Sequence, residues 1–126
     1  LEQGIGIVCS SLALMRGGEI YVPKIPSMRM VDLAEAIAPG VPHRMVGIRA
    51  GEKLHEVMVT EDDALQTLEL EDRYVIIPGY ATWLREDYLA NGGRPVAERF
   101  AYASNTNSEW LTPASFTAML ESPGSA

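Results

Sequence analysis

The first apolar positions of the chain recur at helical spacing. They stand at i, i+4, i+7, i+8 and i+11, which are Leu1, Ile5, Val8, Cys9 and Leu12. This pattern predicts an amphipathic helix, with Arg16 in its last turn and Gly17 or Gly18 as its stop. A chain that begins inside such a helix is expected to be a piece of a longer protein.

A short strand and a second helix are predicted next. The strand covers residues 19–22 ("EIYV"), and Pro23 and Pro26 prevent its continuation. Ser27 then stands where a helix N-cap is expected. The helix that follows is predicted to bury one stripe, formed by Met30, Leu33, Ala34, Ile37 and Ala38.

The middle of the chain predicts two more strands with a helix between them. Residues 44–48 ("RMVGI") and 73–77 ("RYVII") have the composition of strands. Thr60 and Asp63 have the spacing of a capping box, which predicts a short helix through about Leu68.

The last third of the chain predicts less regular structure. Residues 80–100 carry "NGGRP" and mixed polar positions, so we expect an irregular excursion there. Asn105 and Asn107 are expected to form a turn. Thr112 is expected to cap a final helix that begins at Pro113, and 122–126 is expected to be a frayed tail.

Helices and strands therefore alternate, which predicts a mixed α/β fold. We expect a single segment over 1–126. Its core helix–strand units lie in 1–79, the excursion in 80–100, the return segment and final helix in 101–121, and the tail in 122–126.

Composition narrows the classes of function. The 126 residues are 47% hydrophobic and carry a net charge of −7, with an isoelectric point near 4.7. An acidic chain is a poor partner for nucleic acid. No apolar run approaches the ~20 residues of a membrane span, and Cys9, His43 and His55 match no metal-ligand spacing. We therefore expect no nucleic acid, membrane or metal partner, and a cytoplasmic location.

A complete active site is not recognisable in the sequence. Gly4-Ile5-Gly6 falls inside the first predicted helix, so it is not a dinucleotide-binding G-x-G-x-x-G loop. No tyrosine is followed four residues later by a lysine, and no G-x-S-x-G is present. We therefore name no catalytic residue in this chain, and we expect it to be inactive alone.

The charged stretch after residue 48 is the best candidate for a binding site. Arg49 follows a predicted strand, at the point where ligand crevices open in α/β folds. A guanidinium can hold two phosphate oxygens, Gly51 permits a tight turn, and the Glu52 carboxylate can accept from vicinal hydroxyls. This set suits a nucleoside diphosphate. The alternative is an ordinary surface pair between Arg49 and Glu52, worth about 0–1 kcal/mol.

Two stretches carry a resemblance to a known family. "GGEIYVPKIPSMRMVDLAEAIAP" and "GIRAGEKLHEVMVTEDDA" closely resemble the C-terminal part of bacterial NDP-sugar 4,6-dehydratases, which are polysaccharide biosynthesis proteins and extended short-chain dehydrogenase/reductases. The inverting UDP-N-acetylglucosamine branch of pseudaminic acid biosynthesis is the most similar. The resemblance covers 1–77, returns at "YASNTNSEWLT" (102–112), and is weak over 78–100.

The resemblance implies a role for several residues. It implies that Arg49 contacts the UDP diphosphate and Glu52 the ribose hydroxyls, while Lys24 and Gly51 could approach the substrate. Where the family usually has proline, this chain has Ala50. Met28 and Met30 are expected to fill the core rather than to support the uracil.

The resemblance also implies a reaction and its partners. In the full enzyme, a lyase, NADP oxidises C4 of UDP-GlcNAc or a related UDP-sugar, water is lost across C5–C6, and hydride returns to C6. A Rossmann domain missing from this chain would bind NADP, and the full enzyme is expected to form a homo-oligomer. Two alternatives stay open: a non-catalytic nucleotide-binding or assembly module, and part of an NDP-sugar epimerase or a retaining dehydratase.

Overall fold

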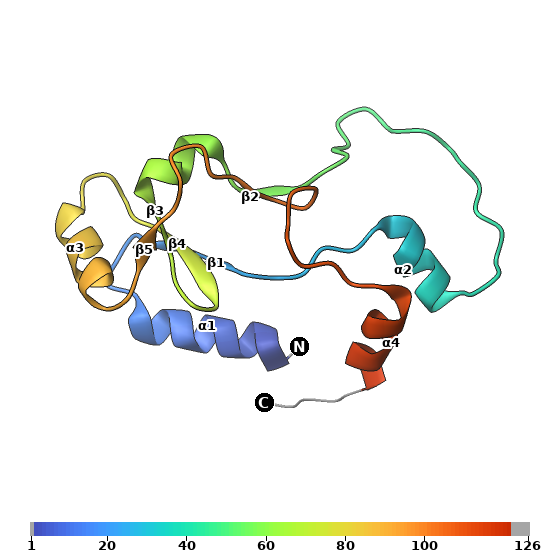
Figure 1. The fold of residues 1–126 in the computed structure, drawn as a ribbon, viewed down its shortest axis with the longest axis horizontal. Coiled ribbons are helices and arrows are strands. Elements are labelled where there is room, and N and C mark those ends of the chain that lie inside the picture. Colours follow the sequence, from blue (N-terminus) through green and yellow to red (C-terminus); the bar gives the residue numbers. More distant parts are fainter. Residues whose placement is uncertain (1, 122–126) are drawn as a thin grey trace. The chain divides into compact units, whose positions relative to one another are not determined.

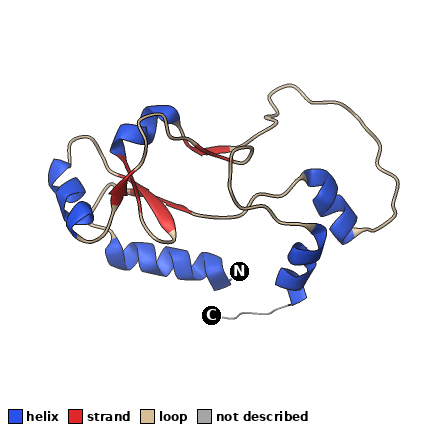
Figure 2. Ribbon diagram, in the orientation of Figure 1, coloured by secondary structure: helices blue, strands red, loops and turns tan. Residues whose placement is uncertain are grey.

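A computed structural model describes residues 2–121 (Figure 1). The described chain separates into two compact units. The first unit contains residues 2–24 and 57–102, and the second unit contains 25–56 and 103–121. Leu1 and the predicted tail 122–126 lie outside the described residues. Both units contain helices joined by irregular segments, and strands form the centre of the first (Figure 2). The mixed α/β class is therefore confirmed.

The first unit is built on a four-stranded antiparallel sheet. Its strands are β1 (Ile20–Pro23), β3 (Thr67–Glu69), β4 (Arg73–Ile76) and β5 (Arg94–Pro95), in the order β1-β4-β3-β5. Val75 on β4 pairs with Tyr21 on one side and with Leu68 on the other. The strands predicted over 19–22 and 73–77 are confirmed, with limits one residue different at the ends.

The helix expected after Thr60 is shorter and tighter than predicted. It is the 3₁₀ helix η1 (Glu61–Gln66), and Thr60 is its N-cap residue. The Thr60 hydroxyl donates to the Asp63 carboxylate at 2.6 Å, so it does not cap a backbone N–H group. Leu68 belongs to β3 because its side chain is completely buried in the sheet core. A short second sheet pairs β2 (Val57–Val59) with β6 (Tyr102–Ala103).

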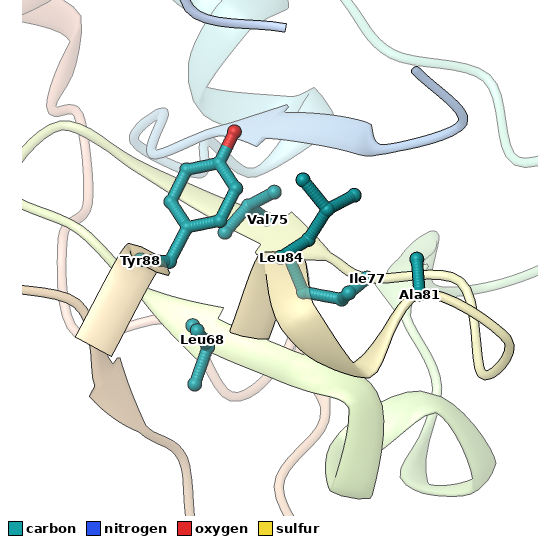
Figure 3. Packing of buried hydrophobic residues seen from close by; sticks show 6 residues of the cluster. All are labelled: Leu68, Val75, Ile77, Ala81, Leu84 and Tyr88. Atoms are coloured by element: carbon teal, nitrogen blue, oxygen red, sulfur yellow. The ribbon is translucent and has the colours of Figure 1, made fainter. Parts of the chain in front are cut away.

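The expectation of an irregular segment over 80–100 is wrong. Helix α3 (Thr82–Ala90) and strand β5 lie there. Leu84 and Tyr88 are four residues apart, so both face the sheet from one side of α3. Figure 3 shows this core cluster, which contains Leu68, Val75, Ile77, Ala81, Leu84 and Tyr88.

Helix α1 (Glu2–Leu14) confirms the first predicted helix, but it ends before Arg16, which was expected in its last turn, and it has no buried residue. Its link to the sheet is polar. The Arg73 guanidinium donates to the hydroxyls of Ser10 at 2.8 Å and Ser11 at 2.9 Å. The same group holds the Asp72 carboxylate through two hydrogen bonds of 2.8 and 2.6 Å. The Arg73 side chain is only 5% exposed, so this buried cation connects α1 to β4.

The second unit contains the helices α2 (Met30–Ile37) and α4 (Pro113–Glu121), which contact each other. The cap of α4 is confirmed, because the Ser115 N–H donates to the Thr112 hydroxyl at 3.1 Å. The buried stripe of α2 is wrong. No residue of this helix is buried, and Met30 and Ile37 are 74% and 69% exposed. Met30 therefore does not fill a core.

Two further predictions in the second unit are corrected. Ser27 is not the cap of α2, whose N-cap is Arg29, because Ser27 forms a parallel bridge to Trp110. Residues 44–48 do not form a strand. Gly47 has φ 78°, which breaks an extended backbone, and Met45 and Val46 are 90% and 78% exposed. Within residues 2–121, no helix combines the length and apolarity that a membrane crossing needs.

Candidate functional site

Arg49 and Glu52 are the first and last residues of a tight turn. The Glu52 N–H donates to the Arg49 carbonyl at 3.1 Å, and the Arg49 N–H donates to Glu52 Oε2 at 2.7 Å. Gly51 has φ 85°, the value that the third residue of a type II turn requires. The two candidate ligands are thus brought together by local backbone geometry, and not by the end of a strand.

The side chains of this turn are open to solvent. Arg49 Nε lies 3.4 Å from Glu52 Oε1, and the side chains are 84% and 47% exposed. A pair this exposed contributes about 0–1 kcal/mol, so a ligand can separate it at small cost. Glu52 keeps one oxygen on the backbone of Arg49 and presents the other beside the guanidinium.

The turn lies on the edge of an open groove in the second unit. The groove has a volume of about 770 Å³. Gly51 and Glu52 line it, whereas Arg49 is on the same turn but outside the lining. The groove is lined by Met30, Arg44, Met45, Val46, Gly47, Ile48, Gly51, Glu52, Lys53, Leu54 and Glu56.

The groove brings in residues that the sequence reasoning did not select. Arg44 and Lys53 add two cations to the Arg49–Glu52 turn, and Met30 and Met45 add exposed thioether side chains. The spacing of Arg44 and Arg49 around the apolar "MVGI" could have indicated this cluster. It was missed because the run was interpreted as a buried strand, which would separate the two arginines.

Lys24 belongs to the first unit, where its ammonium has several acceptors. It donates to Glu69 Oε1 and to the Leu70 carbonyl, both at 2.8 Å, and to the Glu71 carbonyl at 3.2 Å. It also lies 5.2 Å from the centre of the Tyr74 ring. The hydrogen bond from Lys24 lowers the pKa of Glu69. These contacts secure the turn between β3 and β4, so a substrate contact by Lys24 would have to replace them.

The described residues do not fit NADP. A dinucleotide loop needs glycines in a turn whose N–H groups face the pyrophosphate, whereas Gly4 and Gly6 have helical backbone in the first half of α1. Among residues 2–121 there is also no cluster of three acidic, histidine or cysteine side chains that could hold a metal.

Position 50 offers a test of how far the turn is organised before a ligand arrives. Proline is favoured at the second residue of a type II turn, so Ala50→Pro should restrict the unfolded and open states. We expect a gain of about 0.4–1 kcal/mol in the ordered turn, which shifts the population toward the ordered state by roughly two- to fivefold. Amide hydrogen exchange at Glu52, whose N–H closes the turn on the Arg49 carbonyl, measures this in both chains.

Gly51→Ala is the matched opposite change. A Cβ at Gly51 would meet no atom within 4 Å, so the only cost is the backbone strain at φ 85°. That strain is about 1–2 kcal/mol for a residue with a side chain. Amide exchange at Glu52 should accelerate in this variant. Equal exchange rates at Glu52 in all three chains would contradict a turn whose order depends on residues 50 and 51.

Comparison with known proteins gives a consistent set of matches. Residues 1–78 match the polysaccharide biosynthesis protein family. UDP-N-acetylglucosamine 4,6-dehydratases (inverting) from two Campylobacter jejuni strains are each 44% identical over 117 residues, which is 89% of this chain and 35% of theirs. An uncharacterized membrane protein of Methanocaldococcus jannaschii is 33% identical over 89 residues, 62% of this chain and 27% of its own. The chain thus spans about a third of the length of these curated relatives.

One solved structure shows the same fold. The X-ray structure of Pen from Bacillus thuringiensis matches 95% of this chain and 34% of that chain, with a TM-score of 0.72 and 20% sequence identity. The likeness concerns the fold, and it includes both units of the described chain.

Proposed function

Since the chain belongs to the polysaccharide biosynthesis protein family, we propose that it binds the UDP part of a UDP-sugar. In this proposal it is the substrate-binding portion of an NADP-dependent UDP-N-acetylglucosamine 4,6-dehydratase that makes sugars for surface or flagellar glycans. The observation that carries the proposal is the turn that places Arg49 beside Glu52 on the edge of a groove with further cations.

The diphosphate is the part of UDP that these cations suit best. In a chain of net charge −7, Arg44, Arg49 and Lys53 gather within ten residues of one another on one irregular segment. Arg49 can hold two phosphate oxygens in one plane, and its exposed ion pair costs little to open. Arg44 and Lys53 would add charge along the groove.

Glu52 suits the ribose. Its Oε2 is fixed by the Arg49 N–H at 2.7 Å, which sets the direction of the carboxylate. Its second oxygen can accept hydrogen bonds from vicinal hydroxyls once Arg49 turns to phosphate. Met30 and Met45, both exposed in the groove, offer soft apolar contacts to a base.

The chemistry is assigned to residues outside this chain. The sequence holds no Tyr-x-x-x-Lys pair, and Gly4 and Gly6 are helical, so NADP binding and proton transfer are proposed for another part of a longer dehydratase. The residues described above would hold the UDP-sugar while that part acts. Lys24 keeps a place in the proposal only as a residue that could approach the sugar.

A titration of the isotope-labelled chain with UDP, followed by heteronuclear NMR, tests the binding. We expect saturable shifts centred on residues 47–56, no comparable shifts with uridine, and weaker shifts with ADP. If a folded sample shows no shift with UDP, the proposal for this chain fails. Saturable binding of UDP by a longer chain that does not dehydrate UDP-GlcNAc would favour the epimerase or the assembly module.

A further inference from the structure

Both ends of the segment that carries the groove contact one short stretch of chain. The groove segment is residues 25–56, and the stretch is residues 104–111, here called the clasp segment. All of these residues belong to the second unit. The clasp segment includes the "SNTNSEWL" part of the motif at 102–112, for which the proposed function gives no role.

The N-terminal end of the groove segment is fixed through backbone hydrogen bonds at Ser27. The Ser27 N–H donates to the Glu109 carbonyl at 2.9 Å, and the Ser27 carbonyl accepts from the Leu111 N–H at 2.8 Å. These bonds form the parallel bridge between Ser27 and Trp110. Ser27 is three residues before Met30, which lines the groove.

The Asn107 side chain adds further hydrogen bonds at the same N-terminal end. Its Nδ2 donates to the Ile25 carbonyl at 2.7 Å and to the Ser27 hydroxyl at 3.1 Å. Its Oδ1 accepts from the Glu109 N–H at 3.2 Å. The Asn107 carbonyl accepts from the Trp110 indole N–H at 2.7 Å. Asn107 therefore shapes the clasp segment and joins it to the groove segment at the same time.

The C-terminal end of the groove segment is fixed by a reciprocal pair of hydrogen bonds between Ser104 and Glu56. The Ser104 N–H donates to the Glu56 carbonyl at 2.8 Å, and the Glu56 N–H donates to the Ser104 hydroxyl at 3.0 Å. Glu56 also lines the groove. The same stretch of eight residues thus holds the chain just before and just after the candidate site.

We propose that residues 104–111 act as a clasp, with Ser104 and Asn107 as positioning residues that hold the groove in its binding shape. Between the end of α2 and the start of β2, residues 38–56 contain no helix or strand, and most of their side chains are exposed. A loop with so few internal bonds is ordered mainly by the closure of its ends. The part of the inference that concerns UDP rests on the proposed function.

The experiment compares Ser104→Ala, Asn107→Asp and the double variant with the unchanged chain. Asn107→Asp keeps the acceptor for the Glu109 N–H but removes the donors to Ile25 and Ser27. The hydrogen bonds between backbone groups of the clasp segment and the groove segment stay in place in these variants. We therefore expect about threefold weaker UDP binding for each single variant and about tenfold weaker binding for the double variant. Amide exchange at Arg49 and Glu52, whose N–H groups are hydrogen-bonded within the turn, should accelerate by similar factors.

Thr106→Ala is the matched control, because among residues 2–121 the Thr106 hydroxyl has one long hydrogen bond, to the Ala103 carbonyl at 3.5 Å. It should change neither readout, and Ser104→Thr, which keeps the hydroxyl, should restore the exchange rates. Unchanged exchange at Arg49 and Glu52 in the double variant, with the amides of Leu68 and Val75 still protected, would overturn the clasp. If the unchanged chain does not bind UDP, the proposed function fails while amide exchange still decides the clasp.

Discussion

Replacing Asp72 with alanine is expected to destabilise the first unit by about 2–3 kcal/mol, between the cost of breaking an exposed and a fully buried ion pair. The Arg73 side chain is 5% exposed and the Asp72 side chain 57% exposed, so the pair lies at the boundary of the interior. Without Asp72, the buried guanidinium would keep only the hydroxyls of Ser10 and Ser11 as hydrogen-bond partners. Neither hydroxyl carries a charge that compensates the cation.

The effect should depend on pH with a defined sign. The hydrogen bond from Arg73 lowers the pKa of the Asp72 carboxyl below its ordinary value. A lowered pKa in the folded state gives stability that is fully present above the unfolded value, about 4, and is lost as pH falls through the folded value. The difference between Asp72→Ala and the unchanged chain should therefore be large at pH 7 and decrease on acidification below about pH 4.

Urea unfolding followed by far-ultraviolet circular dichroism at pH 7 and pH 3 measures both effects. Arg99→Ala is the control, because its partner Glu61 lies at 3.4 Å and both side chains are exposed, at 88% and 55%. That pair should contribute less than about 1 kcal/mol at either pH. If Asp72→Ala lowers the free energy of unfolding at pH 7 by no more than Arg99→Ala does, then Arg73 does not need its counter-charge.

Elements with local signals were predicted well from the sequence. The strand at Ile20–Pro23 follows two glycines with φ 126° and 89°, and the helix at Pro113 has a side-chain cap and a proline at its first position. In both places the residues that set the limits are adjacent to the element. The Arg49–Glu52 pair belongs to the same class, since a turn of four residues brings its two ends together.

Elements that depend on distant partners were not predictable in this way. Helix α3 begins at Thr82, and its N-cap residue Ala81 offers no capping oxygen. The two buried residues of α3 meet a sheet formed by distant segments. Ser27 has the composition of a cap, but its groups are engaged by Asn107, Glu109 and Leu111, about eighty residues later. Local patterns cannot indicate which of two uses a serine will have.

The groove shows the same limit at the level of the site. Hydrophobic periodicity predicts that Met30 and Ile37 are buried, and composition predicts a strand over 44–48. In the described chain, the apolar side chains at these positions are exposed, namely Met30, Ile37, Met45, Val46 and Ile48. Periodicity identifies the face that avoids water, and it does not identify the surface that covers that face. Arg44 and Arg49 stand on either side of the apolar run in the sequence, but Arg44 and Lys53 share the groove because that run is irregular rather than a strand.

Replacing Arg49 with alanine is expected to weaken UDP binding by about 10- to 100-fold, since hydrogen bonds to a charged group contribute about 1.5–3 kcal/mol. The turn itself should persist, because its bonds use the Arg49 backbone and the Glu52 carboxylate. Loss of affinity would then report the guanidinium alone. Arg49→Lys keeps the charge without the planar pair of donors, so an intermediate affinity is expected.

Isothermal titration with UDP and with UMP distinguishes the contribution of the diphosphate to the affinity from that of the rest of the nucleotide. If Arg49 holds the diphosphate, its loss should cost more affinity for UDP than for UMP, and raised salt should reduce the difference. Arg99→Ala again serves as control, because Arg99 is as exposed as Arg49 but lies in the first unit. If Arg44→Ala lowers the affinity for UDP and Arg49→Ala does not, the diphosphate contact is made by the groove lining. Arg49 would then contribute to the site only through its backbone N–H, which orients Glu52.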